Sequence, residues 1–139
     1  MKISAVIITL NEEKNLPKCL ESLNWVDEII IVDSNSFDNT VSIGRLAGAK
    51  VYEREHWTGF GDQKNKAIKY ATGDWIFSID ADERATPELA HEIKEVISSG
   101  LTVSGLMMPR SMLKEGSGRV AWMILKKSHR VGFIVSIRI

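Results

Sequence analysis

Residues 3–13 read ISAVIITLNEE, an apolar and β-branched run followed directly by polar and acidic residues. The run from Ile3 to Thr9 has the length and the residue types of a β-strand. Because it lacks polar–apolar alternation, it predicts a strand buried on both faces, as in a parallel sheet. Asn11 is placed to cap a following helix, whose apolar side chains recur every three or four residues as far as Leu23.

The next ninety or so residues repeat this alternation of strand and helix patterns. Thr86-Pro87-Glu88 gives the strongest helix start, because it combines a capping hydroxyl, a proline at the first position and a carboxylate in the first turn. Such alternation indicates βαβ units, so the predicted fold class is α/β, with a mostly parallel sheet and helices on both faces. The other expected strands are 28–32, 50–52 and 75–79, and the other expected helices are 39–47, 63–70 and 86–98.

Length and composition indicate one soluble domain. The chain has 139 residues, of which 44% are hydrophobic and 26% charged, close to the globular average. The single cysteine, Cys19, cannot form an internal disulfide, which fits a reducing compartment. No run reaches the roughly 18–20 apolar residues of a membrane helix, and the start turns acidic too early for a signal peptide. A cytoplasmic protein is therefore expected, and no nucleic-acid partner.

The net charge of zero conceals an uneven distribution. Residues 1–100 carry 11 Lys and Arg against 17 Asp and Glu, whereas residues 101–139 carry 7 against 1. Such asymmetry marks either a partner surface or a break in the character of the sequence. We expect two segments, a domain at 1–100 and a different segment at 101–139.

Polar and acidic residues follow the predicted strands. In open α/β sheets, ligands bind beyond the carboxyl ends of the strands. Asn11 follows the first strand, Asp33 the second, and Asp80 and Asp82 the fourth. Turn and capping roles explain part of this pattern, most readily at Asp38. The remainder predicts an acidic ligand-binding edge.

Asp80-Ala81-Asp82 is the sharpest local signal. In an extended chain, residues i and i+2 point to the same side, so the two carboxylates would converge. Such a pair repels unless a cation lies between its members or one of them binds a proton. Mg²⁺ and Mn²⁺ prefer oxygen ligands of this kind, often together with substrate phosphates. The pattern allows either a divalent cation site or a solvated acidic lead-in to the next helix.

Several other chemistries are excluded by missing motifs. The glycine fingerprint of dinucleotide-binding folds, the P-loop and the nucleophile elbow of hydrolases are absent. The three histidines lack zinc-ligand spacing. Cys19 lies on an apolar helix stripe and is expected in the core.

Taken together, these segments resemble the inverting glycosyltransferases of family 2, which have the Rossmann-like GT-A fold. The resemblance is carried by residues 3–13, by 31–40 (IVDSNSFDNT), by 72–75 (TGDW) and by 80–83 (DADE). It spans about residues 2–98.

Within that family, one segment is similar to bacterial lipopolysaccharide core β-1,4-glucosyltransferases. It comprises 53–55 (ERE) and 57–65 (WTGFGDQKN). This similarity implies transfer of glucose from UDP-glucose to an inner-core heptose of a lipopolysaccharide acceptor.

The resemblance also implies roles for single residues. Asp80 and Asp82 match the pair that binds Mg²⁺ or Mn²⁺ and the nucleotide sugar, and Lys64 and Asn65 match positions that help to hold the diphosphate. Asp33 would contact the nucleoside, as would the segment that follows the first strand. The implied substrate-binding residues are Thr9, Leu10, Asn11, Glu12, Asp33, Lys64, Asn65, Asp80 and Asp82.

The sequence departs from the family after residue 100. The resemblance implies a further half that builds the acceptor site and supplies a carboxylate base, yet only one acid, Glu115, follows residue 100. Beyond Pro109-Arg110 the pattern predicts a truncated or frame-shifted ending, with a missing or aberrant acceptor half and an unassigned base. Loss of a general base costs on the order of 10²–10⁴ in rate.

Three alternatives remain open. The chain could bind a nucleotide sugar without transferring it, or it could be a metal-dependent nucleotidyltransferase. The basic segment, with Trp122, Met123, Ile124 and Phe133, either contacts an anionic membrane surface peripherally or is basic by accident.

Overall fold

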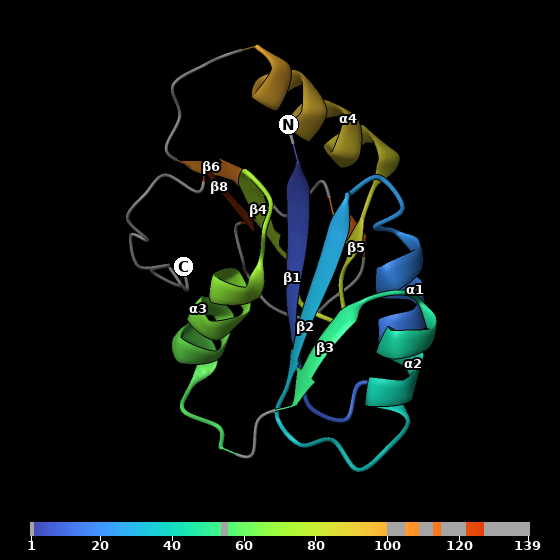
Figure 1. Cartoon of the computed structure of the whole chain (residues 1–139). Coiled ribbons are helices and arrows are strands. Elements are labelled where there is room, and N and C mark those ends of the chain that lie inside the picture. The colour runs from blue at the N-terminus through green and yellow to red at the C-terminus, as the bar shows by residue number, and fades with distance from the viewer. Residues whose placement is uncertain (1, 54–55, 100–104, 109–112, 115–121, 127–139) are drawn as a thin grey trace.

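The computed structural model describes residues 2–53, 56–99, 105–108, 113–114 and 122–126. Predictions made for Pro109, Arg110, Glu115 and Phe133 lie outside these residues. The elements, in chain order, are β1 (Ile3–Thr9), α1 (Leu16–Glu21), β2 (Glu28–Asp33), α2 (Thr40–Leu46), β3 (Lys50–Glu53), α3 (Phe60–Tyr70), β4 (Trp75–Ser78), β5 (Arg84–Ala85), α4 (Pro87–Ser98), β6 (Gly105–Met108), β7 (Leu113–Lys114) and β8 (Trp122–Lys126) (Figure 1).

The main sheet has the strand order β3-β2-β1-β4-β8-β6. Its first four strands are parallel to one another, and β8 runs antiparallel to both of its neighbours. A second, two-stranded sheet pairs β5 with β7. The predicted α/β class with a mostly parallel sheet is therefore confirmed.

Helices cover both faces of the sheet because the buried side chains of β1 alternate between them. Ala5 and Ile7 pack in a core cluster with buried residues of α1 and α4. Val6 and Ile8 pack in a second cluster with Ala67 and other residues of α3. Figure 1 shows α1 and α2 on one side of the sheet and α3 on the other. Burial on both faces explains why β1 reads as a continuous apolar run.

One predicted helix start is confirmed by the structure, and two predicted starts differ from it. Thr86 caps α4, since its hydroxyl accepts the Leu89 N–H at 3.2 Å. The capping role predicted for Asn11 is wrong, because α1 begins after Asn15. Asn11 instead adopts a left-handed backbone conformation, with φ 53°, in the loop before that helix. Helix α3 begins at Phe60, three residues earlier than the periodicity indicated.

The strand β8 was not predicted as part of the sheet. It lies between β4 and β6 and pairs with both. The sequence offered apolar residues there but no turn or capping signal. The described residues give no support to a membrane contact through Trp122, Met123 and Ile124. Among the described residues, no helix is long and apolar enough to cross a membrane.

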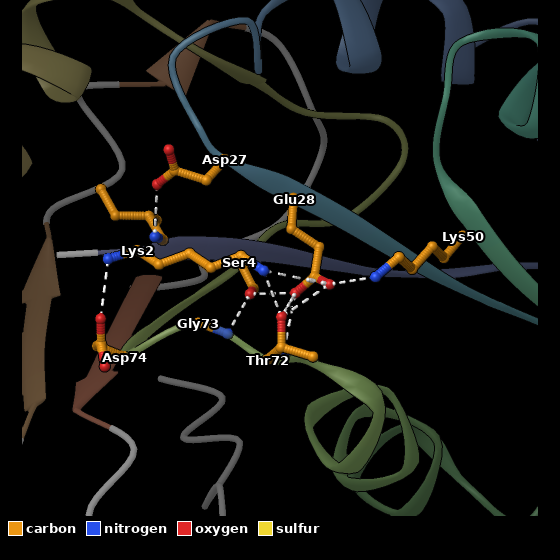
Figure 2. Close-up of polar contacts among 9 residues, drawn as sticks. Lys2, Ser4, Asp27, Glu28, Lys50, Thr72, Gly73 and Asp74 are labelled. Carbon is orange, nitrogen blue, oxygen red and sulfur yellow. Dashed lines mark hydrogen bonds and ion pairs between the residues drawn. The ribbon is translucent and has the colours of Figure 1, made fainter.

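The amino ends of the strands are held together by Glu28, the first residue of β2 (Figure 2). Its side chain is 4% exposed. The carboxylate accepts hydrogen bonds from the Ser4 hydroxyl at 2.6 Å, the Lys50 ammonium at 2.8 Å and the Thr72 backbone N–H at 2.9 Å. One carboxylate thus joins β1, β2, β3 and the chain leading into β4.

Gly73 completes this junction through its lack of a side chain. Its backbone N–H donates to the Ser4 hydroxyl at 2.8 Å. A Cβ at this position would lie 2.5 Å from that oxygen and 2.8 Å from the Ser4 backbone nitrogen. Glycine is therefore required in the TGDW segment by the close approach of two backbones.

Candidate functional site

The carboxyl ends of β1 and β2 meet at a buried hydrogen-bond network. Thr9 and Asp33, the last residues of the two strands, are paired in register. The Thr9 hydroxyl donates to Asp33 Oδ1 at 2.6 Å, and Ser36 donates to the same carboxylate through its backbone N–H and its hydroxyl, both at 2.7 Å. Asp33 is fully buried. In this structure its carboxylate therefore shapes the loop after β2.

The loop after β1 is hydrogen-bonded to the loop after β2. The Asn11 backbone N–H donates to the Ser36 hydroxyl at 2.8 Å, and the Asn11 side-chain oxygen accepts the Phe37 N–H at 3.0 Å. The Glu12 backbone N–H donates to the Thr40 hydroxyl at 2.8 Å. These bonds hold Asn11 in its left-handed conformation, and the preceding residue, Leu10, is 47% exposed. Predicted site residues 9–12 and Asp33 thus form one continuous wall.

The acidic triplet after β4 forms a tight turn, not the extended chain assumed from the sequence. The Glu83 N–H donates to the Asp80 carbonyl at 3.0 Å, and the Glu83 carboxylate accepts the Asp80 N–H at 2.9 Å. The turn brings carboxylate oxygens of Asp80, Asp82 and Glu83 within 4.8 Å of one another. The predicted convergence of Asp80 and Asp82 is present, and it has a third member.

The three carboxylates differ in exposure. Asp82 is exposed, Asp80 is half-buried, and Glu83 is 4% exposed. Burial, and then the charges of Asp80 and Asp82, raise the pKa of Glu83 to about 8. At neutral pH this environment favours the protonated form of Glu83 over the ionised form. Oxygen donors gathered in this way fit Mg²⁺ or Mn²⁺, which prefer carboxylate ligands.

Helix α3 brings a cation to this cluster. Lys64 Nζ lies 3.1 Å from Asp80 Oδ1, and the lysine side chain is 13% exposed. The neighbouring Gln63 is fully buried, and its side-chain amide donates to the Ser34 hydroxyl at 2.8 Å. The amino-terminal half of α3 is thereby fixed against the ends of both β2 and β4.

Among the described residues, no hydrogen bond joins Asn65 to the acidic cluster. Its side-chain oxygen is buried and has no hydrogen-bond partner within the part of the chain that the structure describes. The structure thus joins Lys64 to Asp80 but leaves the predicted role of Asn65 as a prediction.

Two residues of the site were missed from the sequence. Glu83 was overlooked because an extended chain would point it away from Asp80, whereas the turn brings it back. Gln63 was taken only as the start of a helix, although a polar residue on the sheet-facing stripe of α3 was a usable signal. The assignment of Cys19 to the core is confirmed, because it is fully buried and burial is the main cause that raises its pKa to about 12.

The chain is similar to known proteins in both sequence and structure. The family model described as Glycosyl transferase family 2 matches residues 4–131. The chain belongs to glycosyltransferase family 2. This match extends beyond Arg110, the last residue at which the sequence motifs resembled the family. Membership in this family accords with the acidic strand-end site and disfavours the nucleotidyltransferase alternative.

One relative has a known biosynthetic role. The chain is 37% identical over 122 residues to the lipopolysaccharide core biosynthesis glycosyltransferase LpsC of Rhizobium meliloti, and this match covers 85% of the chain and 45% of LpsC. The chain spans only about a third of the length of several other curated glycosyltransferases that it matches.

Two solved structures share the fold. TarS 1–349 of S. aureus, in complex with UDP-GlcNAc, has a TM-score of 0.68 and 28% identity, covering 78% of this chain and 34% of TarS. Glucosyl-3-phosphoglycerate synthase of Mycobacterium tuberculosis, in complex with Mn²⁺, UDP and glucosyl-3-phosphoglycerate, has a TM-score of 0.64 and 26% identity, covering 75% of this chain and 42% of the synthase. The GT-A architecture expected from the sequence is thereby confirmed.

Proposed function

We propose that this chain carries the donor-binding half of a metal-dependent, inverting glycosyltransferase that uses a UDP-sugar. The observation that carries the proposal is the convergence of Asp80, Asp82 and Glu83 at the end of β4, with Lys64 3.1 Å from Asp80. A carboxylate cluster beside an ammonium group at the strand ends suits a divalent cation together with a diphosphate.

Each residue of the site has a defined task in this proposal. Asp80 and Asp82 hold Mg²⁺ or Mn²⁺, and Glu83 fixes their turn through its bond to the Asp80 N–H. When bound, the cation supplies positive charge to the departing diphosphate as the bond between sugar and phosphate breaks. Lys64 provides a second positive charge to the same oxygens and orients them.

The nucleoside is assigned to the wall at the ends of β1 and β2. Segment 9–12 and Asp33 lie there. Gln63, the neighbour of Lys64 on α3, is hydrogen-bonded to Ser34 at the end of β2. Asp33 is fully buried and accepts three hydrogen bonds from Thr9 and Ser36, so its contact with the nucleoside is assigned from its motif position. Asn65 is assigned to the diphosphate on the strength of its motif position.

The sugar and the acceptor are inferred from similarity. Segments 53–55 and 57–65 support glucose as the sugar and inner-core heptose as the acceptor, through a β-1,4 linkage. The relationship to LpsC supports a lipopolysaccharide core acceptor. Residues 1–100 form the donor domain in this proposal, and residues 101–139 begin the acceptor side.

A test of this assignment compares nucleotide sugars by thermal denaturation in the presence of Mn²⁺. UDP-glucose at about 100 times its dissociation constant stabilises the folded state by about 2.7 kcal/mol, which raises Tm by roughly 5–10 °C. We expect a smaller rise with UDP-GlcNAc and GDP-mannose at the same concentration. A larger rise with GDP-mannose would contradict the assignment of UDP-glucose, and no rise with any donor would contradict the proposed function.

A further inference from the structure

Gln63 is a polar side chain in an apolar setting. It lies on the face of α3 that packs on the sheet, and it is fully buried. Among the largest fully buried side chains that the structure describes, it is the only polar one. Ala67, four residues later on the same stripe, packs with apolar residues of β1 and β2. Because burial of an amide is unfavourable unless its hydrogen bonds are made, a glutamine at this position requires partners.

Both ends of the Gln63 amide are paired. The nitrogen donates to the Ser34 hydroxyl at 2.8 Å, and the oxygen accepts a hydrogen bond from the Lys66 ammonium at 3.1 Å. A charged donor on the oxygen polarises the amide and strengthens the bond that its nitrogen makes. Ser34 follows β2 directly, and its backbone N–H donates to the Thr9 carbonyl at the end of β1 at 2.8 Å. Gln63 is thereby connected to the carboxyl ends of two strands.

The next residue on α3 is Lys64, and its place depends on the place of the helix. Its ammonium lies 3.1 Å from Asp80 Oδ1, beyond the end of β4. Ion pairs at a partly exposed edge are weak, and a lysine side chain has many rotamers, so this pair alone does not fix the helix. Apolar contacts such as those of Ala67 have no direction and tolerate small shifts of α3 along the sheet. The directional bond from Gln63 to Ser34 opposes such a shift.

We propose that Gln63 is a positioning residue that holds Lys64 where the diphosphate of the donor binds. This inference rests on the proposed function and deepens it. Gln63 is fully buried, so it acts through Lys64 and does not touch the donor itself. Without its bond to Ser34, the first turns of α3 move relative to the ends of β1 and β2, and the Lys64 ammonium leaves Asp80.

Gln63→Met and Ser34→Ala each remove the bond between α3 and the end of β2. Methionine has nearly the volume and flexibility of glutamine but no amide, so the helix still packs. Ser34→Ala removes the other end of the same bond and is the smaller change. The matched control is Ser4→Ala, which removes a buried serine hydroxyl at the amino end of the sheet, where it donates to Glu28 at 2.6 Å. All three variants are expected to lower Tm.

Chemical labelling of lysines in the whole 139-residue chain, without ligand, measures the placement of Lys64. Its side chain is 13% exposed. We expect acetic anhydride to modify Lys64 several-fold faster in Gln63→Met and Ser34→Ala than in the wild type, as measured by mass spectrometry. Lys94, exposed on α4, is the internal reference, and Ser4→Ala should leave the rate at Lys64 unchanged. An unchanged rate in Gln63→Met, or an equal increase in Ser4→Ala, would overturn the inference and leave the donor site intact.

Calorimetric affinities for UDP and for inorganic pyrophosphate, both with Mn²⁺, show whether this placement matters for the donor. Gln63→Met is expected to weaken the binding of both ligands about three- to tenfold, because each binds through its diphosphate. Ser4→Ala should change neither affinity. A loss shared by UDP and pyrophosphate, together with faster labelling of Lys64, supports the inference.

The other outcomes separate the inference from the function on which it rests. Wild-type protein that binds neither UDP nor pyrophosphate would overturn both. Affinities that are unchanged in Gln63→Met, or that fall equally in Ser4→Ala, would overturn the positioning role alone. A loss for UDP without a loss for pyrophosphate would also overturn it, because Gln63 would then support the nucleoside wall and not Lys64.

Discussion

Replacing Asp80 and Asp82 together with asparagine is expected to abolish the Mn²⁺-dependent binding of UDP-glucose, with an affinity loss of at least about 100-fold. The two substitutions remove two negative charges from a site where three carboxylates converge. Divalent cations of this class bind through charged oxygen ligands, and neutral amides replace them poorly. Isothermal titration calorimetry at a fixed Mn²⁺ concentration measures the loss directly.

Stability in the absence of metal separates this effect from misfolding. Asp80 and Asp82 repel each other, so their neutralisation relieves repulsion while it removes the ion pair from Lys64 to Asp80. The two changes oppose each other, and we expect Tm without ligand to stay close to that of the wild type. Glu21→Gln combined with Glu88→Gln is the matched control, since it removes two exposed charges elsewhere. An Asp80 and Asp82 variant that binds UDP-glucose like this control would contradict the metal assignment.

Glu28→Gln is expected to lower the free energy of unfolding at pH 7 by about 3 kcal/mol. Burial alone would raise the pKa of Glu28, but the hydrogen bonds from Lys50, Ser4 and Thr72 outweigh it and lower the pKa from 4.5 to about 2. Each pKa unit corresponds to about 1.4 kcal/mol, so the ionised carboxylate contributes roughly 3 kcal/mol. An amide fills the same space but leaves the partly buried partners without a charged acceptor.

The stabilisation by Glu28 depends on pH, because its pKa is shifted by folding. Because the pKa is lower in the folded state, the contribution is fully present above about pH 4.5 and is lost as pH falls toward about 2. Urea denaturation at pH 7 and at pH 3 should show a large difference between wild type and Glu28→Gln at pH 7 and a smaller one at pH 3. Glu21→Gln, on the exposed end of α1, serves as the control. A difference that does not change with pH would contradict the role of the charge.

The parts of the fold that could be predicted were those in which local pattern and tertiary environment agree. β1 matched its predicted bounds because all seven of its residues are buried, and continuous burial produces a continuous apolar run. Thr86-Pro87 marked the start of α4 because capping is a local interaction. In contrast, Asn11 has the residue type of a cap, but its bonds to the loop after β2 hold it outside the helix.

The sequence indicated which residues lie near one another at the candidate site, but it did not indicate how the chain is arranged there. Thr9, Asp33, Asp80 and Lys64 lie at the expected sheet edge because parallel strands place their carboxyl ends together. The turn at 80–83 depends on backbone hydrogen bonds that no spacing rule indicates, and it alone brings in Glu83. The start of α3 at Phe60 was missed, since the entry to this helix depends on Gly59, whose φ of 105° suits glycine.

The strand β8 shows a different limit. Its place between β4 and β6 depends on long-range pairing, and the flanking residues give no local signal for it. A sequence pattern can mark a strand that begins or ends with turn residues, but it cannot choose a partner for a strand that lacks them.

The central claim is that Asp80 and Asp82, in the turn that Glu83 fixes, form a divalent cation site that serves a bound nucleotide diphosphate. Crystals of the chain grown with Mn²⁺ and UDP, with data collected at the manganese absorption edge, test it most directly. We predict one strong anomalous peak in contact with carboxylate oxygens of Asp80 or Asp82 and with diphosphate oxygens, near Lys64. A peak elsewhere, or UDP bound at the sheet edge with no peak at these carboxylates, would contradict the account.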